Sequence, residues 1–279
     1  MAVLEGLRGA GLRGLEWHEA PLAMRTQLAR IHTSEHLGRI LDAHISTPVW
    51  LDPDTGMNIH SAEAALRAAG AACAGVDAVL TQLCRRVFCA VRPPGHHATP
   101  DQAMGFCLFN SLAVAARQAL DVHLLERVAI VDFDVHHGNG TQACFEHEPR
   151  VMYVSSHQSP LYPFTGLASE HGVGNIHNAL LPAGSGSAAF RAVWREQLLP
   201  ALEAFRPQLL LIMAGFDVHR ADPLANLQLE TGDFAWLTGE LVDLARRHAD
   251  GRIVSALEGG YDLDALRASV VAHVRELLE

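Results

Sequence analysis

The chain has 279 residues, of which 49% are hydrophobic and 19% charged, and its formal net charge is −10. This composition supplies a large buried core and excludes a disordered or collagen-like protein. All 21 basic residues are arginine and form no long run, so no nucleic-acid partner is expected. No apolar stretch is long enough for a signal peptide or a membrane span, which predicts a cytoplasmic protein without a membrane partner.

Apolar strands alternate with amphipathic helices along the chain. The pattern predicts, in chain order, a helix over 61–75, a strand over 87–92, a helix over 110–120, strands over 128–135 and 151–156, a helix over 188–205, a strand over 209–217, a helix over 233–248 and a strand over 253–261. Near-continuous hydrophobic strands between helices indicate a parallel sheet covered on both faces. No linker or repeat interrupts the pattern, so we expect one domain over residues 1–279.

Polar residues follow these predicted strands directly. They are His96, Asp134, Ser155, Asp217 and Tyr261. Ligands of open α/β sheets bind beyond the carboxyl ends of the strands. We therefore expect five segments to place polar side chains at one edge of the sheet.

Three of the polar residues in VDFDVHHG are spaced like the ligands of one cation. If the strand continues through Asp132, Asp134 and His136, their side chains leave the same face. Asp217 ends a second apolar strand. Two carboxylates and one imidazole suit Zn²⁺ and leave room for water and substrate. The alternative is that the aspartates only cap a turn, but the second aspartate at a second strand end favours a metal site.

A histidine pair, His96 and His97, follows the Pro93-Pro94-Gly95 turn. A neutral histidine near a metal site can accept a proton from water, and a charged one can protonate a leaving amine. The alternative is that this histidine pair, like most tandem histidines in loops, is exposed to solvent and has no catalytic role. The neighbouring metal cluster favours the catalytic interpretation.

The motifs RPPGHHA, GFCLFN, VDFDVHHGNGTQ, AGFDVHRADPL and LEGGYD, in this order, resemble the histone deacetylase family. The resemblance is closest to the class II branch and the bacterial relatives that include acetylpolyamine amidohydrolases, and it covers nearly all of the chain. It implies a three-layer α/β/α domain around a parallel sheet of about eight strands, the arginase/deacetylase fold. It also implies hydrolysis of an acyl-amide with one Zn²⁺ held by Asp134, His136 and Asp217.

The resemblance also implies catalytic roles. His97 would be the general base and then the general acid, paired with Asn139, while Asp132 would hold His96. Tyr261 would donate a hydrogen bond to the substrate carbonyl. Asn139 stands where class I members have Asp, which favours the class II branch.

A substrate channel and its rim follow from the same resemblance. The implied residues are Gly105, Phe106, Tyr162, Asp54 and Leu224. Phe106 and Tyr162 would line a narrow apolar channel for the stem of an acyl-lysine or acyl-polyamine; the alternative for both is core packing. Asp54, in preference to Asp52, would grip the substrate at the rim. Leu224 is not the acidic residue that would favour a polyamine, so acyl-lysine is preferred.

The family also binds K⁺ beside the catalytic metal. The resemblance implies one site formed by backbone oxygens of Asp132, Asp134, His136 and Ser156 with the Ser155 hydroxyl. A second site would use the carbonyl oxygens of Phe145 and Val151.

Three alternatives stay open at this point. The first concerns the mouth of the pocket. The family's N-terminal His-Pro-Glu-x-Pro-x-Arg segment ends at about the residue where this chain begins. Either the pocket is wider than in the family, or another subunit of a homo-oligomer completes it, or the start of the chain is mis-assigned and upstream residues are missing. An arginase-like enzyme with two Mn²⁺ would need a carboxylate where Gly138 stands. A non-catalytic binding protein of this fold would lack one of the metal ligands or Tyr261, and this chain has all of them.

The expected partner is an acetylated lysine side chain or an acetylated polyamine-like small molecule.

Overall fold

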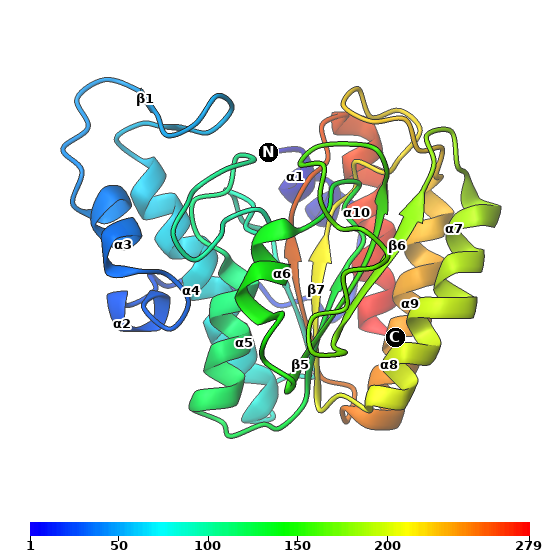
Figure 1. Ribbon diagram of the computed structural model, residues 1–279. Helices are drawn as coiled ribbons and strands as arrows, with labels where there is room; N and C mark the ends of the chain where they lie inside the picture. The colour runs from blue at the N-terminus through cyan, green and yellow to red at the C-terminus, as the bar shows by residue number, and fades with distance from the viewer.

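The computed structural model describes residues 1–279 and contains a six-stranded parallel sheet between two layers of helices (Figure 1). The strands lie in the order β3-β8-β7-β4-β5-β6. Their bounds are Arg86–Cys89 (β3), Val128–Asp132 (β4), Val151–Gln158 (β5), Ile176–Leu181 (β6), Leu209–Ala214 (β7) and Ile253–Leu257 (β8). The predicted α/β/α architecture is confirmed, but the sheet has six strands where about eight were expected.

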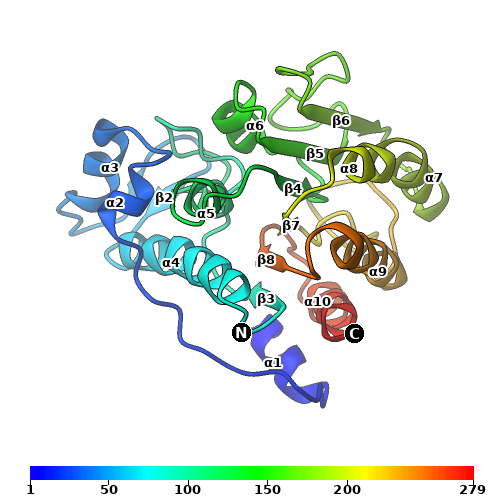
Figure 2. The same ribbon diagram turned by 90° about the horizontal axis from the view of Figure 1, so that it is seen from below.

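Helices cover both faces of the sheet. Helices α4, α5 and α6 lie on one face, and α7 to α10 lie on the other (Figure 2). Their bounds are Ala2–Gly9 (α1), Arg25–Leu28 (α2), Ser34–Leu41 (α3), Ser61–Leu80 (α4), Ser111–Asp121 (α5), Asn139–Phe145 (α6), Ser187–Val193 (α7), Leu199–Phe205 (α8), Thr231–His248 (α9) and Leu263–Leu278 (α10). A π-helical segment, Trp194–Leu198, joins α7 to α8. The pattern did not predict β6, α6 or α10.

The central strand β7 shows why the strands are hydrophobic throughout. Leu209, Leu211 and Met213 belong to the core against α4 and α5, whereas the alternate residues Leu210 and Ile212 belong to the core against α9 and α10. Successive side chains of a strand point to opposite faces, and both faces here are covered. A continuous apolar run is therefore required at this position.

The neighbouring strands β4 and β7 mark the point where the strand order reverses. From β4 the chain continues outward to β5 and β6, and from β7 it continues in the opposite direction to β8. Asp132, the last residue of β4, is in register with Met213 of β7. The connections after these two strands therefore diverge, which opens a crevice of the kind that binds ligands in α/β proteins.

All five predicted strands end at a different residue from the predicted one, and β7 and β8 end at Ala214 and Leu257, before Asp217 and Tyr261. Strand β4 ends at Asp132, so the strand does not continue to His136. The Asp134 N–H donates to Oδ1 of Asp132 (3.1 Å), and the Val135 N–H donates to Oδ1 of Asp217 (2.9 Å). Because carboxylates take these donors, the segment leaves the sheet. Strand β3 also ends early, and β5 extends to Gln158, so Ser155 lies inside a strand and not after it.

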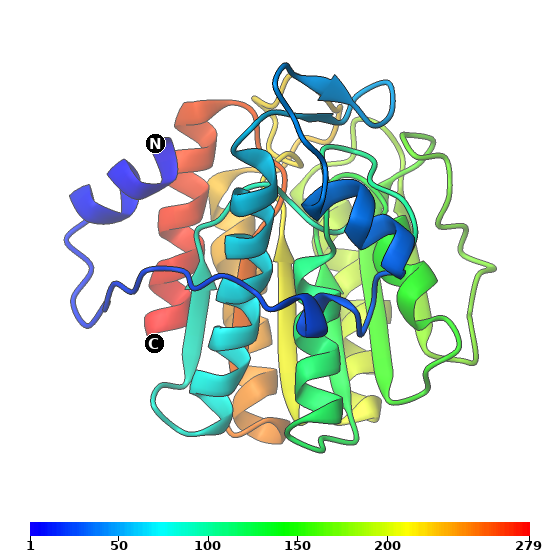
Figure 3. The same cartoon turned by 90° about the vertical axis from the view of Figure 1, so that its left-hand side faces the viewer.

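The N-terminal part of the chain lies outside the sheet. Helix α1 packs on α10 and buries Val3 and Leu7. Strands β1 (Val49–Trp50) and β2 (Gly56–Met57) form an antiparallel hairpin at the end of the molecule where the carboxyl ends of the sheet strands lie (Figure 3). None of the helices combines the length and apolar character that crossing a membrane requires.

Candidate active site

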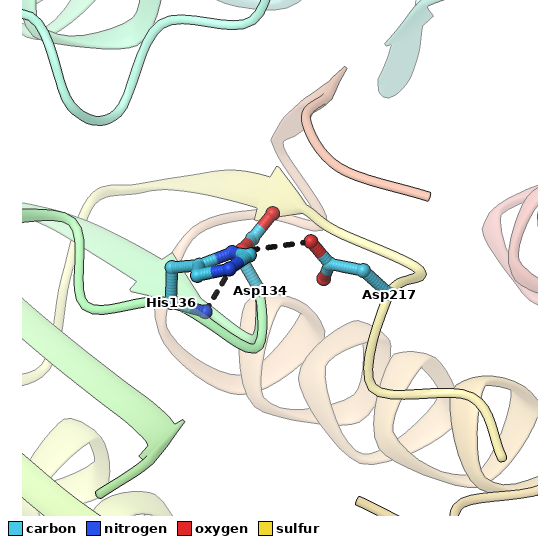
Figure 4. A group of neighbouring side chains, drawn as sticks. All are labelled: Asp134, His136 and Asp217. Carbon is cyan, nitrogen blue, oxygen red and sulfur yellow. Dashed lines mark hydrogen bonds and ion pairs between the residues drawn. The ribbon is translucent and has the colours of Figure 1, made fainter. Parts of the chain in front are cut away.

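Three side chains from the segments after β4 and β7 meet at the carboxyl edge of the sheet (Figure 4). The Nδ1 atom of His136 lies 3.0 Å from Oδ1 of Asp134 and 3.3 Å from Oδ2 of Asp217. One potential ligand atom from each residue lies within 4.8 Å of the other two. The structure therefore brings the predicted trio together, although a loop and not a strand presents His136.

The trio has the electrostatic properties of a cation site. Asp217 is buried, and its Oδ2 atom makes no hydrogen bond. Burial, and then the negative charge of Asp134, raise the pKa of Asp217 to about 7, because two buried carboxylates repel each other. A divalent cation would bind the oxygen that accepts no hydrogen bond and would offset this repulsion, and Zn²⁺ accepts such a donor set. The residues present fit a bound metal ion.

Glycines let neighbouring loops pack directly against the carboxylates. A Cβ atom on Gly259 would lie 2.1 Å from Oδ2 of Asp217, and one on Gly215 would lie 2.2 Å from Oδ2 of Asp134. The Gly259 N–H donates a 2.9 Å hydrogen bond to that Asp134 oxygen. Backbone donors thus orient the carboxylates, as outer partners do at metal sites.

His97 is a buried histidine with one defined tautomer. Its Nδ1 atom lies 2.8 Å from Oδ1 of Asn139, and Nδ2 of Asn139 faces the sulfur of Met104 at 3.3 Å. An amide oxygen can only accept, so Nδ1 carries the proton and Nε2 keeps a free lone pair. Burial, and then the positive charge of His96, hold the pKa of His97 well below its usual value. The imidazole is neutral at pH 7 and can accept a proton.

His96 is the charged member of the pair. Its Nδ1 atom lies 3.1 Å from Oδ2 of Asp132, and its Nε2 atom lies 3.8 Å from Oδ1 of Asp134. Burial alone would lower the pKa of His96, but the charges of Asp134 and Asp132 and the hydrogen bond to Asp132 raise it to about 10. The Tyr153 hydroxyl donates a 3.0 Å hydrogen bond to the same Asp132 oxygen. Asp132 therefore forms the hydrogen bond to charged His96 that the family resemblance implied.

Glu258 is a buried residue that fixes the histidine loop and was not predicted from the sequence. Its carboxylate accepts hydrogen bonds from the N–H groups of Gly95 (2.6 Å) and His96 (3.2 Å). A signal was available, because Glu258 lies in the LEGGYD motif one residue before Gly259. Tyr153 was also missed, since a tyrosine inside a buried strand has the pattern of a core residue.

Tyr261 follows β8 and packs against Phe106, with ring centroids 6.1 Å apart. The Tyr261 N–H donates a 2.8 Å hydrogen bond to Oδ2 of Asp222. Burial, and then the charges of Asp217 and Asp134, raise the pKa of Tyr261 above its usual value. The hydroxyl therefore stays protonated and can donate a hydrogen bond.

The other predicted channel residues differ in burial. The ring of Tyr162 lies edge-on to His97, with centroids 5.2 Å apart, and its hydroxyl is buried without a hydrogen-bond partner. Phe106 is 39% exposed and Leu224 is 48% exposed. Neither Phe106 nor Leu224 is a core residue, so both offer apolar surface beside the site.

Asp54 lies in the β1–β2 hairpin, and its carboxylate is hydrogen-bonded to the segment that contains Phe106. Oδ1 of Asp54 accepts hydrogen bonds from the Gly105 N–H (3.1 Å) and from the Thr55 hydroxyl (2.7 Å). The Thr55 oxygen in turn accepts one from the Phe106 N–H (3.0 Å). Phe106 has a φ of +65°, which residues other than glycine rarely adopt. The hairpin therefore holds the backbone of a channel residue, a contact that the sequence did not predict.

At the first predicted potassium site, two of the four predicted backbone oxygens are free. The carbonyl oxygens of Asp134 and His136 accept no hydrogen bond within the chain. The Ser155 hydroxyl contacts Nδ1 of His157 at 2.9 Å, and the Ser156 hydroxyl accepts from the Trp194 indole at 3.1 Å. The two free carbonyl oxygens, of Asp134 and His136, could therefore serve as ligands of a cation.

At the second predicted potassium site, the carbonyl oxygens are already hydrogen-bonded. Phe145 and Val151 both accept from the side-chain amide of Asn175, at 2.8 and 2.7 Å. The predicted oxygens do lie together, but an amide nitrogen stands between them. The arrangement does not fit a potassium ion.

A six-stranded parallel sheet between two helical layers, with a trio of candidate metal ligands beside the point where the strand order reverses, defines the class of the molecule as the arginase/deacetylase fold. The sequence model of the histone deacetylase domain matches residues 1–277. The chain therefore belongs to the histone deacetylase family.

Curated relatives and a solved structure agree with this assignment. The chain is 45% identical over 222 residues to chloroplastic histone deacetylase 14 of Arabidopsis thaliana, covering 76% of this chain and 52% of that protein. It is 39% identical to a histone deacetylase-like amidohydrolase of Pseudomonas aeruginosa, covering 95% of this chain and 75% of the relative. The crystal structure of the HDA15 HD domain superposes with a TM-score of 0.93 at 36% identity, over 99% of this chain and 80% of that one. The chain spans about half the length of the Arabidopsis relative.

Proposed function

We propose that this chain is a zinc-dependent amidohydrolase that removes an acetyl or other short acyl group from a lysine side chain or a related small amine. The observation that carries the proposal is the buried Oδ2 atom of Asp217, which accepts no hydrogen bond and lies beside Asp134 and 3.3 Å from Nδ1 of His136. The neutral His97 supplies a base, and membership of the histone deacetylase family supports the same chemistry.

One histidine, His97, carries out both proton transfers of the mechanism. Asp134, His136 and Asp217 would hold the Zn²⁺ ion, which when bound polarises the amide carbonyl and makes water more acidic. The free Nε2 of His97 takes the proton of the attacking water as its oxygen bonds to the carbonyl carbon. The same proton then passes from His97 to the amine nitrogen as the C–N bond breaks. The products are the carboxylic acid and the amine, and at neutral pH the acid gives up its proton and the amine takes one up, so that they leave as carboxylate and ammonium.

His96 and Tyr261 support these transfers without giving up a proton. His96 stays charged beside Asp132, and its charge lowers the pKa of His97, which favours transfer to the amine. The Tyr261 hydroxyl donates a hydrogen bond to the carbonyl oxygen as negative charge develops there, where a preorganised donor stabilises the transition state most.

The substrate class follows from the channel residues. Phe106 and Tyr162 suit an unbranched aliphatic stem, and Leu224 gives no acidic partner for the internal cation of a polyamine. Acetyl-lysine is therefore preferred over an acetylpolyamine. A two-metal, arginase-like reaction is disfavoured, because Gly138 offers no ligand and Asp132 is engaged by His96.

A substrate panel with metal analysis of the same preparation tests the proposal. We expect close to one Zn²⁺ per chain and hydrolysis of a fluorogenic acetyl-lysine peptide, with acetylpolyamines and longer acyl-lysines as comparisons. The His97→Ala variant should keep its zinc and lose activity. Zinc-loaded protein that hydrolyses none of these substrates would overturn the proposal, as would full activity of the His97→Ala variant.

A further inference from the structure

Three backbone carbonyls between α6 and β5 surround the side-chain amide of Asn175. We name the carbonyl oxygens of Phe145, Glu148 and Val151 the carbonyl cage. The Nδ2 atom of Asn175 donates to them at 2.8, 3.1 and 2.7 Å respectively. Asn175 is only 4% exposed, so water does not compete for these contacts. The cage is therefore a buried cluster of oxygens around one nitrogen atom.

The hydrogen-bond network fixes the orientation of this amide. The Oδ1 atom of Asn175 accepts from the Val173 N–H at 3.2 Å. The reversed orientation would place an acceptor oxygen against three carbonyl oxygens and an N–H against another N–H. The partial positive charge of the amide group therefore faces the cage.

Carbonyl oxygens that converge on one point are the ligands that K⁺ takes in place of its water shell. In this chain Nδ2 stands at the point that all three oxygens share, so an ion and the amide cannot be there together. We propose that Asn175 takes the place of the cation at the carbonyl cage. The second potassium site implied by the family resemblance is then absent from this protein.

The amide satisfies the cage without an ion. The Phe145 and Glu148 oxygens also accept the N–H groups of Glu148 (2.9 Å) and Val151 (3.0 Å), so Asn175 supplies their second hydrogen bonds. The Asn175 carbonyl accepts the Tyr153 N–H at 2.9 Å, which joins the cage to β5. Because a ligand stabilises only a state that binds it, this region should gain no stability from K⁺.

Thermal unfolding in KCl and in choline chloride of equal ionic strength tests the proposal. Asn175→Ala removes the amide and leaves the cage open to an ion. The variant should unfold at least about 3 °C lower than wild type in choline chloride and should recover part of that loss in KCl. The matched control is Asn178→Ala, because its buried amide donates to Gln142 and Leu167 and not to the cage. Its KCl response should equal that of wild type.

A second measurement decides the question if the variant does not fold. Wild-type crystals soaked in RbCl should show no anomalous Rb⁺ peak within the cage, and Asn175→Ala crystals should show one. Rb⁺ in the wild-type cage with the Asn175 side chain displaced would overturn the proposal, as would equal KCl responses of all three proteins. An equal KCl effect in all three proteins would come from outside the carbonyl cage, for example from the first predicted potassium site, where the carbonyl oxygens of Asp134 and His136 accept no hydrogen bond.

Discussion

The Nδ1 atom of His97 and the Oδ1 atom of Asn139 are 2.8 Å apart, and this contact decides which nitrogen of the imidazole can act as a base. Replacing Asn139 by Asp keeps the acceptor but adds a negative charge that stabilises the imidazolium. The pKa of His97 should rise, by about one unit. Since only neutral His97 can accept a proton, the acid limb of the kcat/KM profile should move to higher pH. An acid limb at an unchanged pH would remove His97 from the role of base.

Removing the Tyr261 hydroxyl should slow the chemical step without preventing substrate binding. The Tyr261→Phe variant keeps the ring that packs on Phe106 but loses the donor to the developing oxyanion. We expect kcat to fall about 10²- to 10³-fold, as for other single donors of this kind, with KM and zinc content close to those of wild type. A loss confined to KM would show that the tyrosine only binds the substrate.

A methyl group at Gly259 should weaken metal binding. The Cβ atom of alanine would lie 2.1 Å from Oδ2 of Asp217 and 2.7 Å from Oδ2 of Asp134, so these carboxylates must move. The Gly259→Ala variant should retain clearly less Zn²⁺ after dialysis. Gly232→Ala is the control, because its Cβ atom would meet nothing within 4 Å. Equal zinc retention in both variants would contradict the metal site.

The hairpin contact to Phe106 should affect substrate binding more than chemistry. Thr55→Val removes the oxygen that accepts the Phe106 N–H. The loss of one such hydrogen bond corresponds to about 1 kcal/mol, so KM should rise about fivefold with little change in kcat. Thr55→Ser keeps the hydroxyl and should restore the wild-type KM. A fall in kcat alone would assign Thr55 a different role.

Buried neutral histidines should destabilise the fold in acid. Burial lowers the pKa of His273 to about 3, and burial and then the charge of His36 lower that of His32 to about 3. Below pH 6.5 the unfolded chain binds these protons and the folded chain does not. Stability should therefore fall as the pH drops from 6.5 toward 3, by up to about 1.4 kcal/mol per pH unit for each histidine.

Denaturant unfolding across this pH range measures that slope. The Nδ1 and Nε2 atoms of His273 are hydrogen-bonded to the hydroxyls of Thr238 and Ser255. The His273→Gln variant keeps a neutral polar group at this position. The variant should lose stability less steeply toward acid pH than wild type does. Substitution of the exposed His60 by Gln is the control and should leave the slope unchanged.

The sequence determined the layers of the fold and the members of the metal site. Apolar runs such as 128–132 and 209–214 have no polar face, so they require a sheet buried on both sides. Asp134 and Asp217 each follow such a run, and parallel strands bring their carboxyl ends to one edge. The periodicity did not find β6, whose Asn178 and partly exposed His177 interrupt the apolar pattern.

Only the tertiary structure decided how the site residues are held. Glu258 and Gly95 are 163 positions apart, Thr55 and Phe106 are 51 apart, and Asn175 reaches carbonyls 24 to 30 positions away. Local patterns cannot register such pairs, because hydrogen bonds between distant segments depend on how loops meet after the sheet has formed. The type of chemistry was therefore readable from neighbouring residues, whereas the filled carbonyl cage and the hairpin contact were not.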